Sequence, residues 1–163
     1  MALKPDREYN ETTDITNFWY TDQTSAEKGG VASVVTQGSG AAIGQNYTDE
    51  PNVVSYATSA SGAVPKGILL QTVSPVMSTN RDFINYENQE IRPGDKCTLV
   101  KKGFVVTDMI TGTPVTGGIA YLGASGNIST TSGSFGGTAT PVVGRFETTK
   151  DANGFARVSI DIG

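Results

Sequence analysis

Two stretches of the sequence decide the fold: residues 66–108, KGILLQTVSPVMSTNRDFINYENQEIRPGDKCTLVKKGFVVTD, and residues 140–162, TPVVGRFETTKDANGFARVSIDI. The second has the clearest pattern, because Val158, Ile160 and Ile162 alternate with polar residues after the turn at residues 151–154. Alternation with a period of two is typical of a strand with one buried face, and Asn-Gly is typical of a tight turn. This part of the chain therefore predicts a β-hairpin that ends the fold.

Further short strands are predicted upstream of this hairpin. The residues Arg92-Pro93-Gly94-Asp95 predict a turn that opens a strand over residues 96–101, and Gly103 separates it from another strand over residues 104–107. Residues 119–122 and 127–129 predict a second hairpin, and no convincing amphipathic helix is present. We therefore predict an all-β protein, built as a small β-barrel or sandwich.

The first third of the sequence is less regular. Residues 1–28 are polar and charged except at residues 15–20, and residues 29–44 are rich in Gly, Ala and Ser. The small-residue segment is compatible with a weak strand or with an extended linker. The prediction is an extended, partly irregular N-terminal arm with the small-residue segment, residues 1–64, followed by a β-barrel domain, residues 65–163.

Three consecutive aromatic residues, Phe18, Trp19 and Tyr20, follow Ile15 in the N-terminal segment. Neither a helix nor a strand places three adjacent side chains on one face. Two alternatives are open: the aromatic side chains plug the bottom of their own barrel, or they dock on a neighbouring chain, since such residues anchor interfaces. In the second case Ile15, Phe18, Trp19 and Tyr20 are the predicted contact residues.

Composition excludes several classes of partner. The chain has 12 Lys and Arg against 16 Asp and Glu, a net charge of −4, which argues against nucleic-acid binding because phosphate contacts need clustered basic residues. No apolar run approaches the length of a membrane span, so we expect no membrane partner and synthesis in the cytoplasm. The single cysteine, Cys97, alternates with Leu99 and is predicted to fill a core position.

The sequence also argues against catalysis. It contains no histidine, which removes the commonest general base and the usual zinc ligand. The carboxylates Asp82, Glu87, Glu90 and Asp95 lie in a polar, turn-rich stretch with nothing to raise the pKa of one of them selectively. We therefore predict that the protein is not an enzyme and binds no cofactor and no metal.

Several segments carry a resemblance to a known family. They are GILL at residues 67–70, RDFINY at 81–86, GDKCTLVKKGFVVTD at 94–108, and VGRF with DANGFARVSIDI near the end. In this order they resemble the capsid decoration (cement) proteins of tailed bacteriophages, of the kind seen in marine and cyanobacterial phages. The resemblance covers residues 65–162 and leaves about the first 60 residues outside.

The resemblance implies a virion structural protein. It implies a β-barrel on the outer surface of the assembled capsid, commonly a homotrimer, that cements neighbouring major capsid subunits after synthesis in the host cytoplasm. Ile15, Phe18, Trp19 and Tyr20 then become candidate contacts with the capsid or between subunits. The extended N-terminal segment is compatible with an arm that becomes ordered on the capsid.

Two alternative functions are weighed against this one. A phage tail or head-fibre adhesion module shares the β-richness, but it is expected to show repetitive shaft sequence or a cluster of aromatic residues and carboxylates, and neither is evident. A carboxylate-based cell-wall glycosidase is less favoured, because it needs a paired acidic site in a cleft.

Overall fold

The computed structural model describes residues 3–4, 12–20, 25–35, 53–74, 90–135 and 138–163. These residues form a structure that is almost entirely β, with no α-helix, which confirms the predicted all-β class. The elements are β1 (Leu3–Lys4), β2 (Thr12–Trp19), β3 (Val31–Val34), β4 (Val53–Ser55), β5 (Pro65–Leu69), β6 (Thr72–Val73), β7 (Glu90–Ile91), β8 (Lys96–Thr107), β9 (Ile110–Thr111), β10 (Ile119–Leu122), the 3-10 helix η1 (Ala124–Gly126), β11 (Ile128–Ser129), β12 (Ser134–Phe135), β13 (Thr138–Ala139), β14 (Val142–Phe146) and β15 (Ala156–Asp161).

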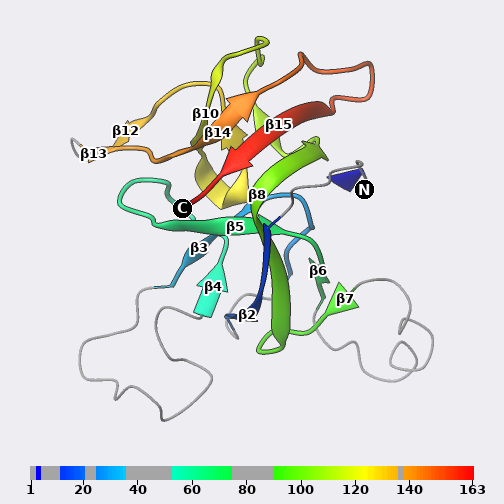
Figure 1. Ribbon diagram of the computed structural model, residues 1–163. Coiled ribbons are helices and arrows are strands. Elements are labelled where there is room, and N and C mark those ends of the chain that lie inside the picture. Colours follow the sequence, from blue (N-terminus) through cyan, green and yellow to red (C-terminus); the bar gives the residue numbers. More distant parts are fainter. Residues whose placement is uncertain (1–2, 5–11, 21–24, 36–52, 75–89, 136–137) are drawn as a thin grey trace.

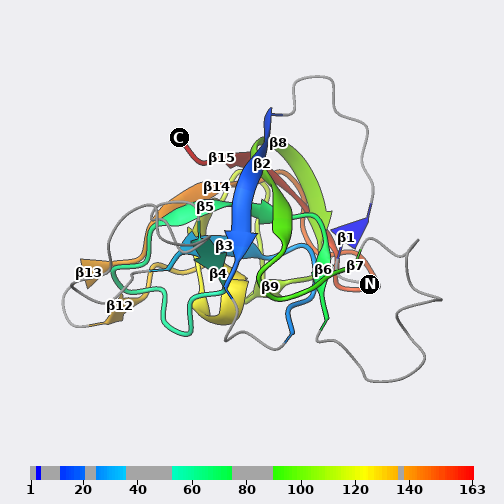
Figure 2. The same ribbon diagram turned by 90° about the horizontal axis from the view of Figure 1, so that it is seen from below.

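Five strands close into a barrel in the order β2-β4-β3-β5-β8, and β8 pairs back onto β2. The pair β2–β4 is parallel, and the other neighbouring pairs in the barrel are antiparallel. Each of the five strands thus has a partner on both sides, so the barrel leaves no open edge that invites pairing with another chain. Figure 2 shows these strands together, with β14 and β15 to one side of them.

Strand β8 belongs both to the barrel and to a second sheet. Its first half pairs with β5 and β2, and its second half pairs with β15 and β1. From β15 the sheet continues through β14, β10 and β11 to β9. Figure 1 shows β10, β14 and β15 above the barrel strands. Gly103 lies inside β8 with a φ of 143°, so the prediction that this residue separates two strands is wrong. A glycine adopts that backbone angle without the penalty of a Cβ, and the strand continues through it.

Two hydrophobic clusters hold the fold together. The first fills the barrel and includes Trp19, Tyr56, Leu69 and Leu99. The second lies between the barrel and the sheet and contains, among others, Val31, Ile68, Val100, Val105, Leu122, Phe146, Val158 and Ile160. Burial of one such aliphatic side chain contributes roughly 1.5–3 kcal/mol, so both clusters stabilise the folded chain against its conformational entropy.

Several local predictions are confirmed. The C-terminal hairpin is formed by β14 and β15, with Val158, Ile160 and Ile162 buried. Its turn is closed by the Gly154 amide, which donates to the Asp151 carbonyl at 3.0 Å. The turn at residues 92–95 is likewise closed, since the Asp95 amide donates to the carbonyl of Arg92. Cys97 is buried in the barrel cluster, as its alternation with Leu99 predicted.

The N-terminal third contributes three of the five barrel strands. Strands β2, β3 and β4 all precede Pro65, and the start of the small-residue segment forms β3 between β4 and β5. The division into an arm, residues 1–64, and a separately folding barrel, residues 65–163, stays a prediction about independent folding. Residues 36–44 of the small-residue segment, residues 81–86, Asp82 and Glu87 lie outside the described residues.

Candidate interaction surface

Trp19 lies inside the barrel. Its side chain is 0% exposed, and its ring meets the Tyr56 ring edge to face, with 5.2 Å between the ring centroids. Strand β2 ends at Trp19. Its end is held by two hydrogen bonds, because the Trp19 amide donates to the Asp95 carbonyl and the Gly94 amide donates to the Trp19 carbonyl. Of the two alternatives open from the sequence, Trp19 therefore follows the first, in which the aromatic side chain fills the interior of its own barrel.

Ile15 lies on an irregularity of β2, where the pairing with β8 changes register between Asp14 and Asn17. Within it, Oδ1 of Asp14 accepts hydrogen bonds from the Thr16 amide at 3.0 Å and from Thr16 Oγ1 at 2.7 Å. Oδ2 of the same carboxylate is 3.0 Å from Lys101 Nζ on β8. Bulges of this kind redirect side chains, and here Ile15 is 65% exposed.

The charge of Asp14 is stabilised by these contacts. Partial burial on its own raises the pKa of Asp14, but the hydrogen bonds from Thr16 and Lys101 outweigh it and hold the pKa well below the usual range. Asp14 is therefore ionised at neutral pH and fixes the backbone on both sides of Ile15. The result is an apolar side chain held outward by a rigid turn.

Phe18 and Tyr20 are half-buried, unlike Trp19 between them. Lys96 Nζ lies over the Phe18 ring, 5.9 Å from its centroid, and the Tyr20 amide donates to the Val54 carbonyl at 2.9 Å. The structure thus gives the four predicted contact residues three environments: Ile15 is exposed, Phe18 and Tyr20 are half-buried, and Trp19 is in the core.

Four exposed apolar residues were missed by the sequence analysis. They are Val64, Val115, Ile119 and Val142, which are between 40% and 68% exposed. A signal for them was present, because all four lie in two long stretches without a single charged residue, residues 51–65 and 109–144. Charged residues are depleted at the centres of protein interfaces, so such stretches indicate surfaces that can be buried against another protein.

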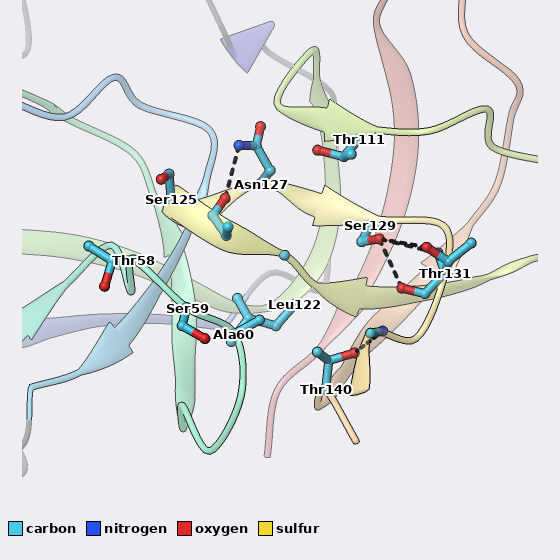
Figure 3. Close-up of a pocket in the computed structure, with 13 residues that line it drawn as sticks. Thr58, Ser59, Ala60, Thr111, Leu122, Ser125, Asn127, Ser129, Thr131 and Thr140 are labelled. Carbon is cyan, nitrogen blue, oxygen red and sulfur yellow. Dashed lines mark hydrogen bonds between the residues drawn. The ribbon is translucent and has the colours of Figure 1, made fainter. Parts of the chain in front are cut away.

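A groove lies within these uncharged stretches. It has a volume of about 450 Å³ and runs between the loop at residues 58–60 and the segment from β10 to β11, as Figure 3 shows. Seven Ser and Thr side chains contribute to its lining, while Ala60 and Leu122, both buried, form part of its base. The groove therefore combines an apolar base with hydroxyl groups that can donate or accept hydrogen bonds.

The described residues show no arrangement suited to metal binding or thiol chemistry. They contain no group of three or more Cys, Asp or Glu side chains that could hold a metal ion. Burial raises the pKa of the Cys97 thiol to about 12, so the thiol is protonated at neutral pH. In the part of the chain that the structure describes, no helix is long and apolar enough to cross a membrane.

The features described so far define a class of protein. A closed barrel that holds an apolar side chain on a fixed turn, and that carries an uncharged groove, is suited to contact with other protein surfaces. A family model described as "Structural cement protein (E217 gp24/Pam3 gp6)" matches residues 8–161, and the chain belongs to this family. It is therefore a structural cement protein of the phage capsid, which confirms the resemblance. Comparison with curated proteins gives no match.

The family match extends further than the resemblance noted in the sequence. It includes β2, β3 and β4, whereas the resemblance was expected to leave about the first 60 residues outside. In this chain these strands close the barrel and contribute Trp19, Ala32 and Val54 to its interior. The match therefore covers all five strands of the barrel.

Proposed function

We propose that the protein binds the outer surface of the assembled capsid and joins neighbouring major capsid subunits, without catalysing a reaction. The observation that carries the proposal is the family match over nearly the whole chain, residues 8–161. We further propose that the protein acts as a homotrimer, with no nucleic-acid or membrane partner. Many copies of a modest interface on one capsid add up to a strong reinforcement, because each attached subunit raises the effective concentration of the next contact.

Ile15 and Phe18 on β2, and Tyr20 directly after it, are the proposed contact residues. Ile15 is supported by its exposure and by the rigid turn around it, since a side chain that is already fixed loses little entropy on binding. In this proposal Trp19 does not touch the capsid, and its side chain holds β2 in place by packing in the barrel interior. A turn anchored in this way keeps Ile15 at a constant position relative to the capsid surface.

Binding to heads that lack the protein tests this proposal. The full chain is mixed with purified heads, pelleted, and quantified in the pellet over a range of concentrations. Wild type is expected to saturate, and Ile15→Ser is expected to bind about thirtyfold more weakly, the usual effect of truncating an interface anchor worth about 2 kcal/mol. Thr149→Ser is the control, because Thr149 is exposed and lies outside β2 and outside both uncharged stretches.

The outcomes separate the function from the site. If wild type does not pellet with heads, or if labelled protein is found on tails or fibres in virions, capsid binding is contradicted. If wild type binds and Ile15→Ser binds equally well, capsid binding stands and the β2 contact is wrong.

A further inference from the structure

The connection between β14 and β15 contains the one Asn-Gly pair of the sequence, Asn153-Gly154 (Figure 1). Asn153 is exposed, and Gly154 has a φ of +87° with no heavy atom, apart from its chain neighbours, within 4 Å of an added Cβ. Asparagine is a chemically labile residue, and a glycine after it leaves the next amide nitrogen without the steric cover of a side chain. The turn therefore brings together a labile side chain, an accessible amide and water.

The reaction open to this pair is deamidation through a cyclic imide. The Gly154 amide nitrogen attacks Cγ of Asn153, so that the N–Cγ bond forms and the Cγ–Nδ2 bond breaks. The side-chain nitrogen takes up the proton lost by the Gly154 amide and leaves as ammonia. Water then adds to either imide carbonyl and opens the ring to Asp or to isoaspartate, so water is the only co-reactant. Both products add a negative charge at neutral pH, and isoaspartate also lengthens the backbone by a carbon atom.

Asp151 holds the backbone amides on which this reaction depends. Its Oδ1 accepts hydrogen bonds from the Asn153 amide at 2.8 Å and from the Phe155 amide at 2.9 Å. Its carbonyl accepts another from the Gly154 amide at 3.0 Å. The Gly154 nitrogen has to lose its proton and approach Cγ of Asn153, and the hydrogen bond to the Asp151 carbonyl opposes both. The turn therefore has to open locally before the amide can react.

We propose that Asn153 is a site of spontaneous deamidation and that the Asp151 carboxylate restrains the reaction by keeping the turn closed. Hydrogen bonds to a charged acceptor are stronger than those between neutral groups, so the two bonds to Oδ1 lower the population of open turns. The inference does not depend on the proposed capsid binding, because it concerns the chemistry of a turn that lies outside β2.

Site-resolved mass spectrometry of the full chain tests the proposal. Wild type, Asp151→Ala and Asp108→Ala are incubated in mildly alkaline buffer, and conversion at Asn153 is followed by peptide mapping that separates Asp from isoaspartate. Asp108→Ala is the matched control, because it removes an exposed carboxylate from another connection, the one between β8 and β9. We expect Asp151→Ala to deamidate about tenfold faster than wild type, the effect of losing hydrogen bonds to a charged group, and Asp108→Ala to react at the wild-type rate.

The same incubation in guanidinium chloride separates the effect of the turn from that of the sequence. There all three chains are expected to react at one rate, faster than folded wild type. Asp151→Asn keeps an oxygen acceptor without the charge and is expected to fall between wild type and Asp151→Ala in buffer. Slow maleimide labelling of the buried Cys97 checks that each variant is folded.

Three results would overturn the inference. Wild type that reacts as fast in buffer as in denaturant has no protection from the turn, and this comparison needs no variant. Folded Asp151→Ala and Asp151→Asn that react at the wild-type rate would show that the carboxylate is not the restraint. No conversion of Asn153 even in denaturant would show that it is not a site of modification.

Discussion

At the scale of single residues, Tyr56 joins three segments that are far apart in the chain. Its hydroxyl donates to the Glu27 carbonyl at 2.5 Å and accepts from the Gly30 amide at 3.1 Å, and burial raises the pKa of Tyr56 far above its usual value. The ring lies so close to Gly30 and Gly126 that a Cβ at either position would come within 2.8 Å of it. The two glycines are thus required by the ring of Tyr56.

A pair of glycine substitutions tests this contact. Gly126→Ala introduces a Cβ 2.6 Å from the Tyr56 ring at a residue with φ of +77°, so we expect a loss of about 2–4 kcal/mol in the free energy of unfolding. Gly62→Ala is the matched control, because its φ is +70° and no heavy atom lies within 4 Å of the added Cβ. It is expected to cost only about 1 kcal/mol of backbone strain. Urea unfolding measures both, and equal losses would show that the ring moves aside freely.

Trp19 gives a second prediction at this scale. Because its side chain is fully buried in the barrel cluster, Trp19→Ala is expected to lower the free energy of unfolding by about 3–5 kcal/mol. Phe18→Ala, in the neighbouring half-buried position, is expected to cost less. Thermal and urea unfolding of the isolated protein check this. A Trp19→Ala variant as stable as wild type would mean that the aromatic ring serves a partner and not the barrel.

At the scale of elements, the pairing of β2 with β8 closes the barrel, and one ion pair spans it. Asp14 on β2 contacts Lys101 on β8 at 3.0 Å and is well shielded, whereas Asp161 and Lys102, on β15 and β8, are 3.7 Å apart and mostly exposed. Exposed pairs contribute little, while a shielded carboxylate with several donors contributes more. The two pairs therefore provide a comparison within one molecule.

Asp14→Asn is expected to destabilise the protein by about 1–2 kcal/mol at neutral pH, and Asp161→Asn by less than about 0.5 kcal/mol. The pKa of Asp14 is lower in the folded protein than its ordinary value of 3.8, so its ionised form stabilises the fold above that value. This stabilisation is lost as the pH falls through the folded pKa. The difference between wild type and Asp14→Asn in urea unfolding should therefore shrink between about pH 7 and about pH 3. A difference that is independent of pH would contradict the role of the charge.

Edge protection also belongs to this scale. Strand β9 ends the order of the large sheet, and Lys150 Nζ donates to the carbonyl of Ile110 on that strand at 3.0 Å. A lysine at an edge strand discourages pairing with another chain. Pairing of another chain with the edge strand β9 is therefore disfavoured.

At the scale of the whole molecule, the sequence predicted what is encoded locally. The turn at residues 151–154 and the alternation after it specify a hairpin through neighbours in the chain, and the structure has that hairpin. Barrel closure is different, because β4 is only three residues long, shows no alternation, and pairs in parallel with β2. No local pattern encodes such a pairing, which depends on Trp19 and Val54 meeting inside the barrel. The exposure of Val64, Val115, Ile119 and Val142 was missed for a related reason. Which face of a strand is buried depends on what packs against the sheet, and the sequence of one strand does not show this.

Truncation tests the predicted boundary between residues 64 and 65. A chain that starts at Gly62 lacks β2, β3 and β4, so β5 and β8 lose their barrel partners and Leu69, Cys97 and Leu99 lose the side chains that cover them. We expect it to show no cooperative urea transition, because two hydrogen-bonding edges and half of a core are exposed at once. A chain that starts at Thr12 keeps the five barrel strands and is the control.

The reactivity of Cys97 gives this experiment its measurement. In the full chain the thiol is buried and its pKa is raised to about 12, so maleimide labelling at neutral pH should be slow until urea unfolds the barrel. The chain from Thr12 should retain that protection, and the chain from Gly62 should be labelled at once without urea. If the shorter chain instead unfolds cooperatively and protects Cys97, residues 65–163 fold by themselves, and the N-terminal strands are an arm added to a complete domain.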